Sequence, residues 1–89
     1  MITLPYWRVF TTQYGKKWFV VEVNKNNSPT CIMLKGSPSL KDSVLKTDLE
    51  TAKEIARAGK TLGRLWGIVS DTGVQLVINK YDNEFKKVI

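Results

Sequence analysis

The sequence predicts an α+β domain with a mostly antiparallel sheet of about five strands and one main helix, in the order β-β-β-(α)-α-β-β. Aromatic and β-branched residues are concentrated in short runs separated by Gly, Asn and Asp, which is typical of strands joined by turns. One segment in the middle of the chain has apolar residues at helical spacing. A length of 89 residues is enough for one hydrophobic core, so we expect residues 1–89 to form a single small domain.

The first two strands are expected to form a β-hairpin that carries most of the aromatic residues. Residues 4–13 and 16–25 are rich in aromatic and β-branched side chains, and Tyr14-Gly15 forms a turn between them. Successive side chains on a strand point to opposite faces. We therefore expect one set to face the core, Trp7, Val9, Phe19, Val21 and Val23, and the other to face outward, Tyr6, Arg8, Phe10, Lys16, Trp18, Val20, Glu22 and Asn24.

A third, shorter strand is expected at residues 30–35, after a cluster of turn-forming residues at 24–28. It ends before Gly36-Ser37-Pro38. Ser37 is a suitable cap for a short helix with Pro38 at its first position. The sequence does not decide between a short helix and a loop for residues 36–46.

The main helix is predicted to begin at a capping box. In Thr47-Asp48-Leu49-Glu50 the first and last side chains can each accept a backbone N–H at the helix start. Gly59 or Gly63 is expected to end the helix. The residues that follow the box at helical spacing give one narrow apolar face, formed by Leu49, Ala52, Ile55 and Ala56.

Two further strands are expected at residues 65–70 and 74–80, joined by a turn at Asp71-Thr72-Gly73. Phe85, Val88 and Ile89 indicate that the last residues pack against the domain. The triplet Asp-Thr-Gly resembles the catalytic triplet of retroviral-type aspartic proteases. Asp and Gly are also ordinary turn residues, and we interpret the triplet as a turn.

The composition excludes several classes of function. The chain has no His and one Cys, which removes most metal sites and catalytic triads, so we expect no metal, no cofactor and no enzymatic activity. No apolar run approaches 18 residues, and the start of the sequence lacks the pattern of a signal peptide. We therefore expect a cytoplasmic protein that does not act at a membrane.

Positive charge and aromatic residues coincide in the first part of the chain. The net charge is +6, and residues 1–36 contain five cations against one carboxylate. Lys and Arg neutralise phosphates, and aromatic rings stack on unpaired bases. We interpret a basic stripe on the helix, Lys53, Arg57 and Lys60, as a solvated face. On the hairpin and its flanks we expect a nucleic-acid-binding site formed by Arg8, Tyr14, Lys16, Lys17, Trp18, Lys25 and Lys35.

The same surface also fits a protein-interaction or inhibitor module. Aromatic side chains and arginine dominate the binding energy of protein interfaces, and the candidate contacts are Tyr6, Arg8, Phe10 and Trp18. An unpaired sheet edge would also permit a homodimer. In its lack of His and its many Lys and Asn residues, the chain resembles the small accessory proteins of phages and mobile elements. That resemblance fits the second interpretation, in which the surface binds a protein partner.

Overall fold

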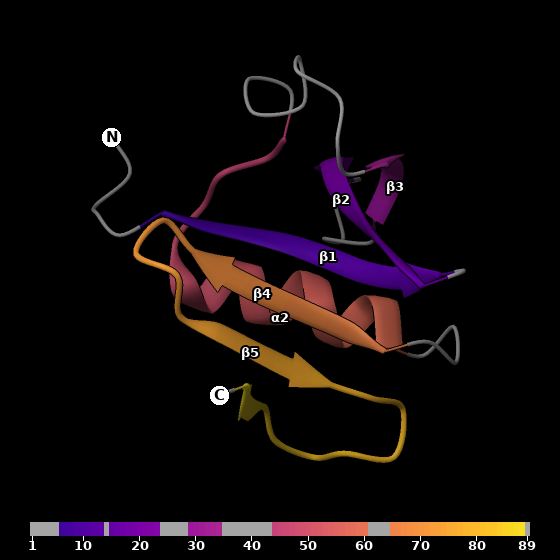
Figure 1. Ribbon diagram of the computed structural model, residues 1–89, viewed down its shortest axis with the longest axis vertical. Helices are drawn as coiled ribbons and strands as arrows, with labels where there is room; N and C mark the ends of the chain where they lie inside the picture. Colours follow the sequence, from indigo (N-terminus) through magenta and orange to yellow (C-terminus); the bar gives the residue numbers. More distant parts are fainter. Residues whose placement is uncertain (1–5, 14, 24–28, 35–43, 61–64, 89) are drawn as a thin grey trace.

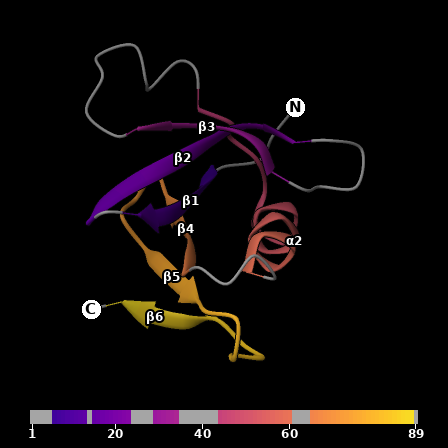
Figure 2. The ribbon, with the colours of Figure 1, turned by 90° about the vertical axis from the view of Figure 1, so that its right-hand side faces the viewer.

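The computed structural model describes residues 6–13, 15–23, 29–34, 44–60 and 65–88, and the predicted α+β fold is confirmed. These residues form one antiparallel sheet in the strand order β3-β2-β1-β4-β5-β6, with a helix against one face (Figures 1 and 2). The elements are β1 (Trp7–Gln13), β2 (Lys16–Val23), β3 (Pro29–Leu34), α2 (Leu49–Lys60), β4 (Trp66–Ser70), β5 (Gln75–Ile78) and β6 (Lys86–Val88).

The observed strands differ from the expected ones mainly at their ends. The five expected strands are present, and the short strand β6 is an addition, because the sequence predicted only that the last residues pack against the domain. Gly15 and Gly73 have positive φ angles in the two expected turns. Four expectations fall outside the described residues, namely the turn at 24–28, the short helix from Ser37, the helix end at Gly63 and the packing of Ile89. Within the described ranges, no helix is long and apolar enough to span a membrane.

Strand β1 lies at the centre of the sheet, between β2 and β4, and β3 and β6 are the two edges. A meander brings β1, β2 and β3 together in chain order. The chain then passes through α2, and β4 pairs with β1 on its other side. The possible homodimer through an edge strand stays a prediction.

A segment outside the regular strands, residues 44–47, fills a gap in the sheet. β1 and β2 pair only in the half of each strand that is next to the turn between them. Beyond that half, β2 diverges from β1 (Figure 1). In the gap, the backbone N–H of Leu45 donates to the carbonyl of Val20 (3.0 Å), and Thr47 exchanges two hydrogen bonds with Trp7 (2.8 and 2.9 Å). This segment therefore pairs with backbone groups that the diverging strands do not use between themselves.

The main core lies between α2 and the sheet. We call this side of the sheet the helix face and the opposite side the far face. The apolar stripe of the helix is confirmed, with Ala52, Ile55 and Ala56 fully buried and Leu49 packed beside them. The residues of the sheet that complete this core are Trp7, Val9, Val20, Trp66, Ile68 and Ile78.

Gly59 is part of the helix and does not end it as expected. Its position faces Trp66, whose ring is fully buried, and a Cβ atom there would lie well inside van der Waals distance of the ring. The helix continues to Lys60. Glycine at this position allows the large ring to approach the helix backbone closely, and this packing offsets the low helix propensity of glycine.

The helix cap differs from the predicted one by one residue. The Asp48 carboxylate, and not the Thr47 hydroxyl, accepts the backbone N–H of Thr51 (3.3 Å), and the Asp48 carbonyl accepts that of Ala52 (3.0 Å). The physical reason is the pairing of Thr47 with Trp7, which uses the Thr47 backbone in the sheet and so delays the helix by one residue. Hydrogen bonds from Thr51 hold the pKa of Asp48 below its usual value.

The far face of the sheet carries a second, smaller apolar cluster. Phe10 is 1% exposed, which contradicts its expected outward position. Its ring lies over Gly67, its partner on β4, and tilts against Phe19 with 5.8 Å between the ring centroids. The cluster consists of Phe10, Phe19 and Val44, with Val69 and Val77 packed against it.

Around Phe19 and Val20 on β2, the side chains point to the opposite faces from those predicted. Phe19 pairs with Phe10 and shares the far face, whereas Val20, expected outward, is fully buried in the main core. Trp18 shares the helix face with Val20 because the two are separated by one residue. A register shift just after Val20 then restores the predicted inward facing at Val23. Alternation was misleading here because both faces of this sheet bury apolar side chains.

We expect Gly59→Ala to lower the free energy of unfolding by about 2 kcal/mol, because the added methyl group overpacks a rigid, buried ring. This cost exceeds the gain of about 1 kcal/mol in helix propensity. Urea denaturation of Gly59→Ala, Trp66→Leu and the double variant measures the change in the free energy of unfolding. The cost of Gly59→Ala should shrink in the Trp66→Leu background, and additive costs would contradict the proposed contact.

The lowered pKa of Asp48 predicts a pH-dependent contribution to stability. A carboxyl whose pKa is lower in the folded state stabilises the fold above its unfolded pKa, near 3.8, and this contribution is lost as the pH falls through the folded value. Asp48→Asn keeps a capping side chain but does not titrate. The melting temperature of the native protein should therefore fall more steeply than that of Asp48→Asn below pH 4, and parallel profiles would contradict this role.

Candidate functional site

The described residues of the expected hairpin site do not form one surface. Arg8 and Lys17 lie on the far face, whereas Lys16 and Trp18 lie on the helix face of β2. Lys16 is exposed beside the turn, and Trp18 is half-buried. The remaining candidates, Tyr14, Lys25 and Lys35, lie outside the described residues. The predicted residues are therefore divided between the two sides of the sheet.

Lys17 contributes to the packing of the far face. Its ammonium lies 4.8 Å from the centre of the Phe10 ring and donates a hydrogen bond to Gln75 Oε1 (2.9 Å) on β5. In a flat sheet Lys17 and Gln75 would be about 14 Å apart across the strands and four residues apart along them, which is further than the two side chains reach together. The sheet must therefore curve strongly at this point. Lys17 and Gln75 close over the Phe10 ring and help to bury it.

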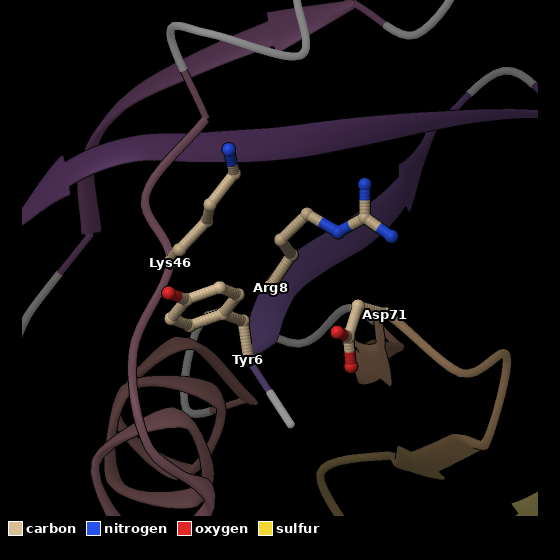
Figure 3. Close-up of a pocket in the computed structure, with 4 residues that line it drawn as sticks. All are labelled: Tyr6, Arg8, Lys46 and Asp71. Atoms are coloured by element: carbon tan, nitrogen blue, oxygen red, sulfur yellow. The ribbon is translucent and has the colours of Figure 1, made fainter. Parts of the chain in front are cut away.

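A pocket of about 290 Å³ lies on the far face at the beginning of β1, lined by Tyr6, Arg8, Lys46 and Asp71 (Figure 3). We call it the Tyr6 pocket. Tyr6 and Arg8 are two residues apart on an extended chain, so their side chains share a face. Lys46 comes from the segment that pairs with β1 through Thr47, and Asp71 follows β4 and donates its backbone N–H to the Tyr6 carbonyl (3.0 Å).

Two cations in the Tyr6 pocket have no partner among the described residues. Neither Arg8 nor Lys46 forms a hydrogen bond or an ion pair within this part of the chain. The two side chains extend to the same side, and the Asp71 carboxylate is turned away from the Arg8 guanidinium (Figure 3). Arg8 and Tyr6 are half-buried, whereas Lys46 and Asp71 are exposed. The arrangement offers a planar guanidinium, an ammonium and a phenol to an anionic ligand.

The basic stripe on the helix contacts the C-terminal segment and is not simply solvated. Lys53 and Arg57 lie 6.0 and 5.4 Å from the ring centre of Phe85. Lys60 donates a hydrogen bond from its ammonium to the carbonyl of Asp82 (2.5 Å). Phe85 itself packs against the main core. Sequence spacing along the helix could not reveal these contacts, because their partners come from the far end of the chain.

Tyr81 is a candidate that the sequence analysis missed. It lies in the turn between β5 and β6 and is 82% exposed, and the Lys80 ammonium lies 5.0 Å from its ring centre. The sequence signal for Tyr81 was weak, because the residue pattern predicts a strand up to residue 80 and no turn at Tyr81, whereas β5 ends at Ile78. The turn lies at the end of the sheet where β1 joins β2, opposite the end that holds the Tyr6 pocket (Figure 1).

Comparisons of the chain with protein-family models, curated proteins and solved structures gave no match. Among the described residues, no group of His, Cys, Asp or Glu side chains is arranged to hold a metal ion. The functional interpretation therefore depends on the surfaces described above.

Burial of Phe10 yields a prediction that separates a core residue from a binding anchor. Phe10→Ala should lower the free energy of unfolding by about 3–5 kcal/mol, because it leaves a cavity between β1, β2 and β4. Tyr6→Ala should cost much less, since this ring is half-buried beside a pocket. Chemical denaturation of the two variants measures the difference. Equal small costs would show that Phe10 is accessible in solution.

Proposed function

We propose that this protein is a small nucleic-acid-binding module that contacts phosphates through the Tyr6 pocket. The main support is that Arg8 and Lys46 both line this pocket, and that neither has an acidic partner among the described residues. A half-buried guanidinium without a carboxylate is poorly compensated, and a phosphate oxygen supplies the missing charge and acceptors. The net charge of +6 favours the approach of a polyanion.

Features beyond the pocket favour a polymer over a small anion. Lys16 is exposed beside the β1–β2 turn, and Lys80 and Tyr81 are exposed in the β5–β6 turn. These residues lie at the end of the sheet opposite the Tyr6 pocket. A nucleic acid has regularly spaced phosphates and flat bases, so it can contact cations and aromatic rings that are far apart on one domain.

The alternative function, a protein-interaction module, has less support. Its three aromatic anchors were Tyr6, Phe10 and Trp18, with Arg8 as a further contact. Phe10 is buried, and Tyr6 and Trp18 belong to opposite faces of the sheet. A single protein interface concentrates its aromatic anchors near its centre, which this arrangement does not allow.

The proposed function predicts a charge-dependent loss of binding in pocket variants. Arg8→Gln should weaken binding of a fluorescein-labelled oligonucleotide about tenfold, and it should reduce the slope of log affinity against log salt by about one. Lys46→Gln should act in the same direction. Fluorescence anisotropy at several salt concentrations measures both quantities.

Lys87→Gln is the matched control, because it removes one charge from an exposed position on β6, away from the pocket. It should change affinity much less than either pocket variant. If all three variants weaken binding equally, the effect is one of net charge, and the pocket is not the phosphate site. If the native protein binds no DNA or RNA at low salt, the proposed function is wrong.

A further inference from the structure

We propose that Tyr81 stacks on an unpaired nucleobase, with Lys80 beside it to contact the adjoining phosphate. This inference rests on the proposed function and adds a preference for single strands to it. Tyr81 is the most exposed large hydrophobic side chain among the described residues. An aromatic ring with most of its surface in water is available to a flat ligand. The Lys80 ammonium lies over the ring, 5.0 Å from its centre, so a base would stack on the opposite face of the ring with this positive charge close by.

The backbone on both sides of Tyr81 is held by hydrogen bonds. The Tyr81 N–H donates to Asn79 Oδ1 (2.9 Å), and the Asp82 N–H donates to the Asn79 carbonyl (3.0 Å). The Asn79 N–H donates in turn to the Asp82 carboxylate (3.0 Å), which also forms an ion pair with Lys86 (3.4 Å). The position of the Tyr81 backbone is therefore set before a ligand arrives, which lowers the entropic cost of binding.

The turn is also attached to the helix. Lys60 donates a hydrogen bond to the Asp82 carbonyl, and Phe85 packs against the main core beneath Lys53 and Arg57. The turn that carries Tyr81 is thus fixed at several points to the rigid part of the domain. A side chain on such a support is suited to act as a stacking platform, because a base that stacks on it gains contact without ordering a loop.

The surroundings of Tyr81 favour a nucleobase over a protein partner. Aromatic anchors of protein interfaces are surrounded by contacts that exclude water. Near Tyr81 in the sequence, Lys80, Asn83 and Glu84 are exposed and polar, and Asp82 is engaged within the turn. A nucleobase needs no such rim, because it supplies its own flat apolar surface and a phosphate for the cation.

The experiment compares single-stranded oligothymidylate with a duplex and with an abasic strand of the same length, using labelled strands and fluorescence anisotropy. Tyr81→Ala should weaken binding of oligothymidylate about five- to hundredfold, the range that one stacked base contributes. Tyr81→Phe keeps the flat ring and should keep the affinity, whereas Tyr81→Leu should lose it. Asn83→Ala, an exposed change in the same turn, is the matched control and should bind like the native protein.

The outcomes separate this inference from the function on which it rests. Loss of oligothymidylate binding in Tyr81→Ala, with little change for the abasic strand, supports stacking. If Tyr81→Ala binds oligothymidylate like the native protein, or loses all three ligands equally, the stacking inference is overturned. The proposed function then still stands, provided that Arg8→Gln weakens binding. If the native protein binds none of the three strands at low salt, both proposals fail together.

Discussion

The rest of the structure depends on the burial of both faces of the central β1–β4 pair. On the helix face the Trp66 ring packs against Gly59 of α2, and on the far face the Phe10 ring packs over Gly67. Trp66 and Gly67 are neighbours on β4, so this strand supplies the large ring on one side and the space for a ring on the other. Each glycine is required by an aromatic ring, and each ring fixes the distance between two elements.

This double burial determines where a binding site can form. Because Phe10, Lys17 and Gln75 close the middle of the far face, solvent-facing cations are left at the ends of the strands. The first of these places is the Tyr6 pocket, where the segment at 44–47 adds Lys46 to the residues of β1. The second is the turn that carries Tyr81. Both lie where regular pairing stops, which is where side chains can face a ligand without disturbing the core.

Local patterns in the sequence predicted the elements well. The turns at Gly15 and Gly73, the five strands and the apolar stripe of α2 each depend on neighbouring residues, and all were found. The facing of Phe10 and of β2 was wrong because alternation assumes one buried face, whereas this sheet buries side chains on both. The helix cap was misplaced because Thr47 pairs with Trp7, a contact between residues far apart in the chain. The Tyr6 pocket and the attachment of the Tyr81 turn to α2 arise from such distant contacts too, and so they could not be predicted from local spacing.

The position of β1 has a consequence for how quickly the domain assembles. Its pairing with β2 is local, but the hydrogen bond from Thr11 to the carbonyl of Leu65 joins residues 54 positions apart. Closing so long a loop costs chain entropy before the contacts of β4 compensate for it, so we expect this domain to fold more slowly than a helical bundle of the same size. A meander that forms before β4 pairs with β1 would expose one edge of β1 together with Phe10 and Phe19. Chain concentration during refolding therefore influences the yield, because the edge and the two rings offer a second chain the pairing surface that β4 occupies in the native fold.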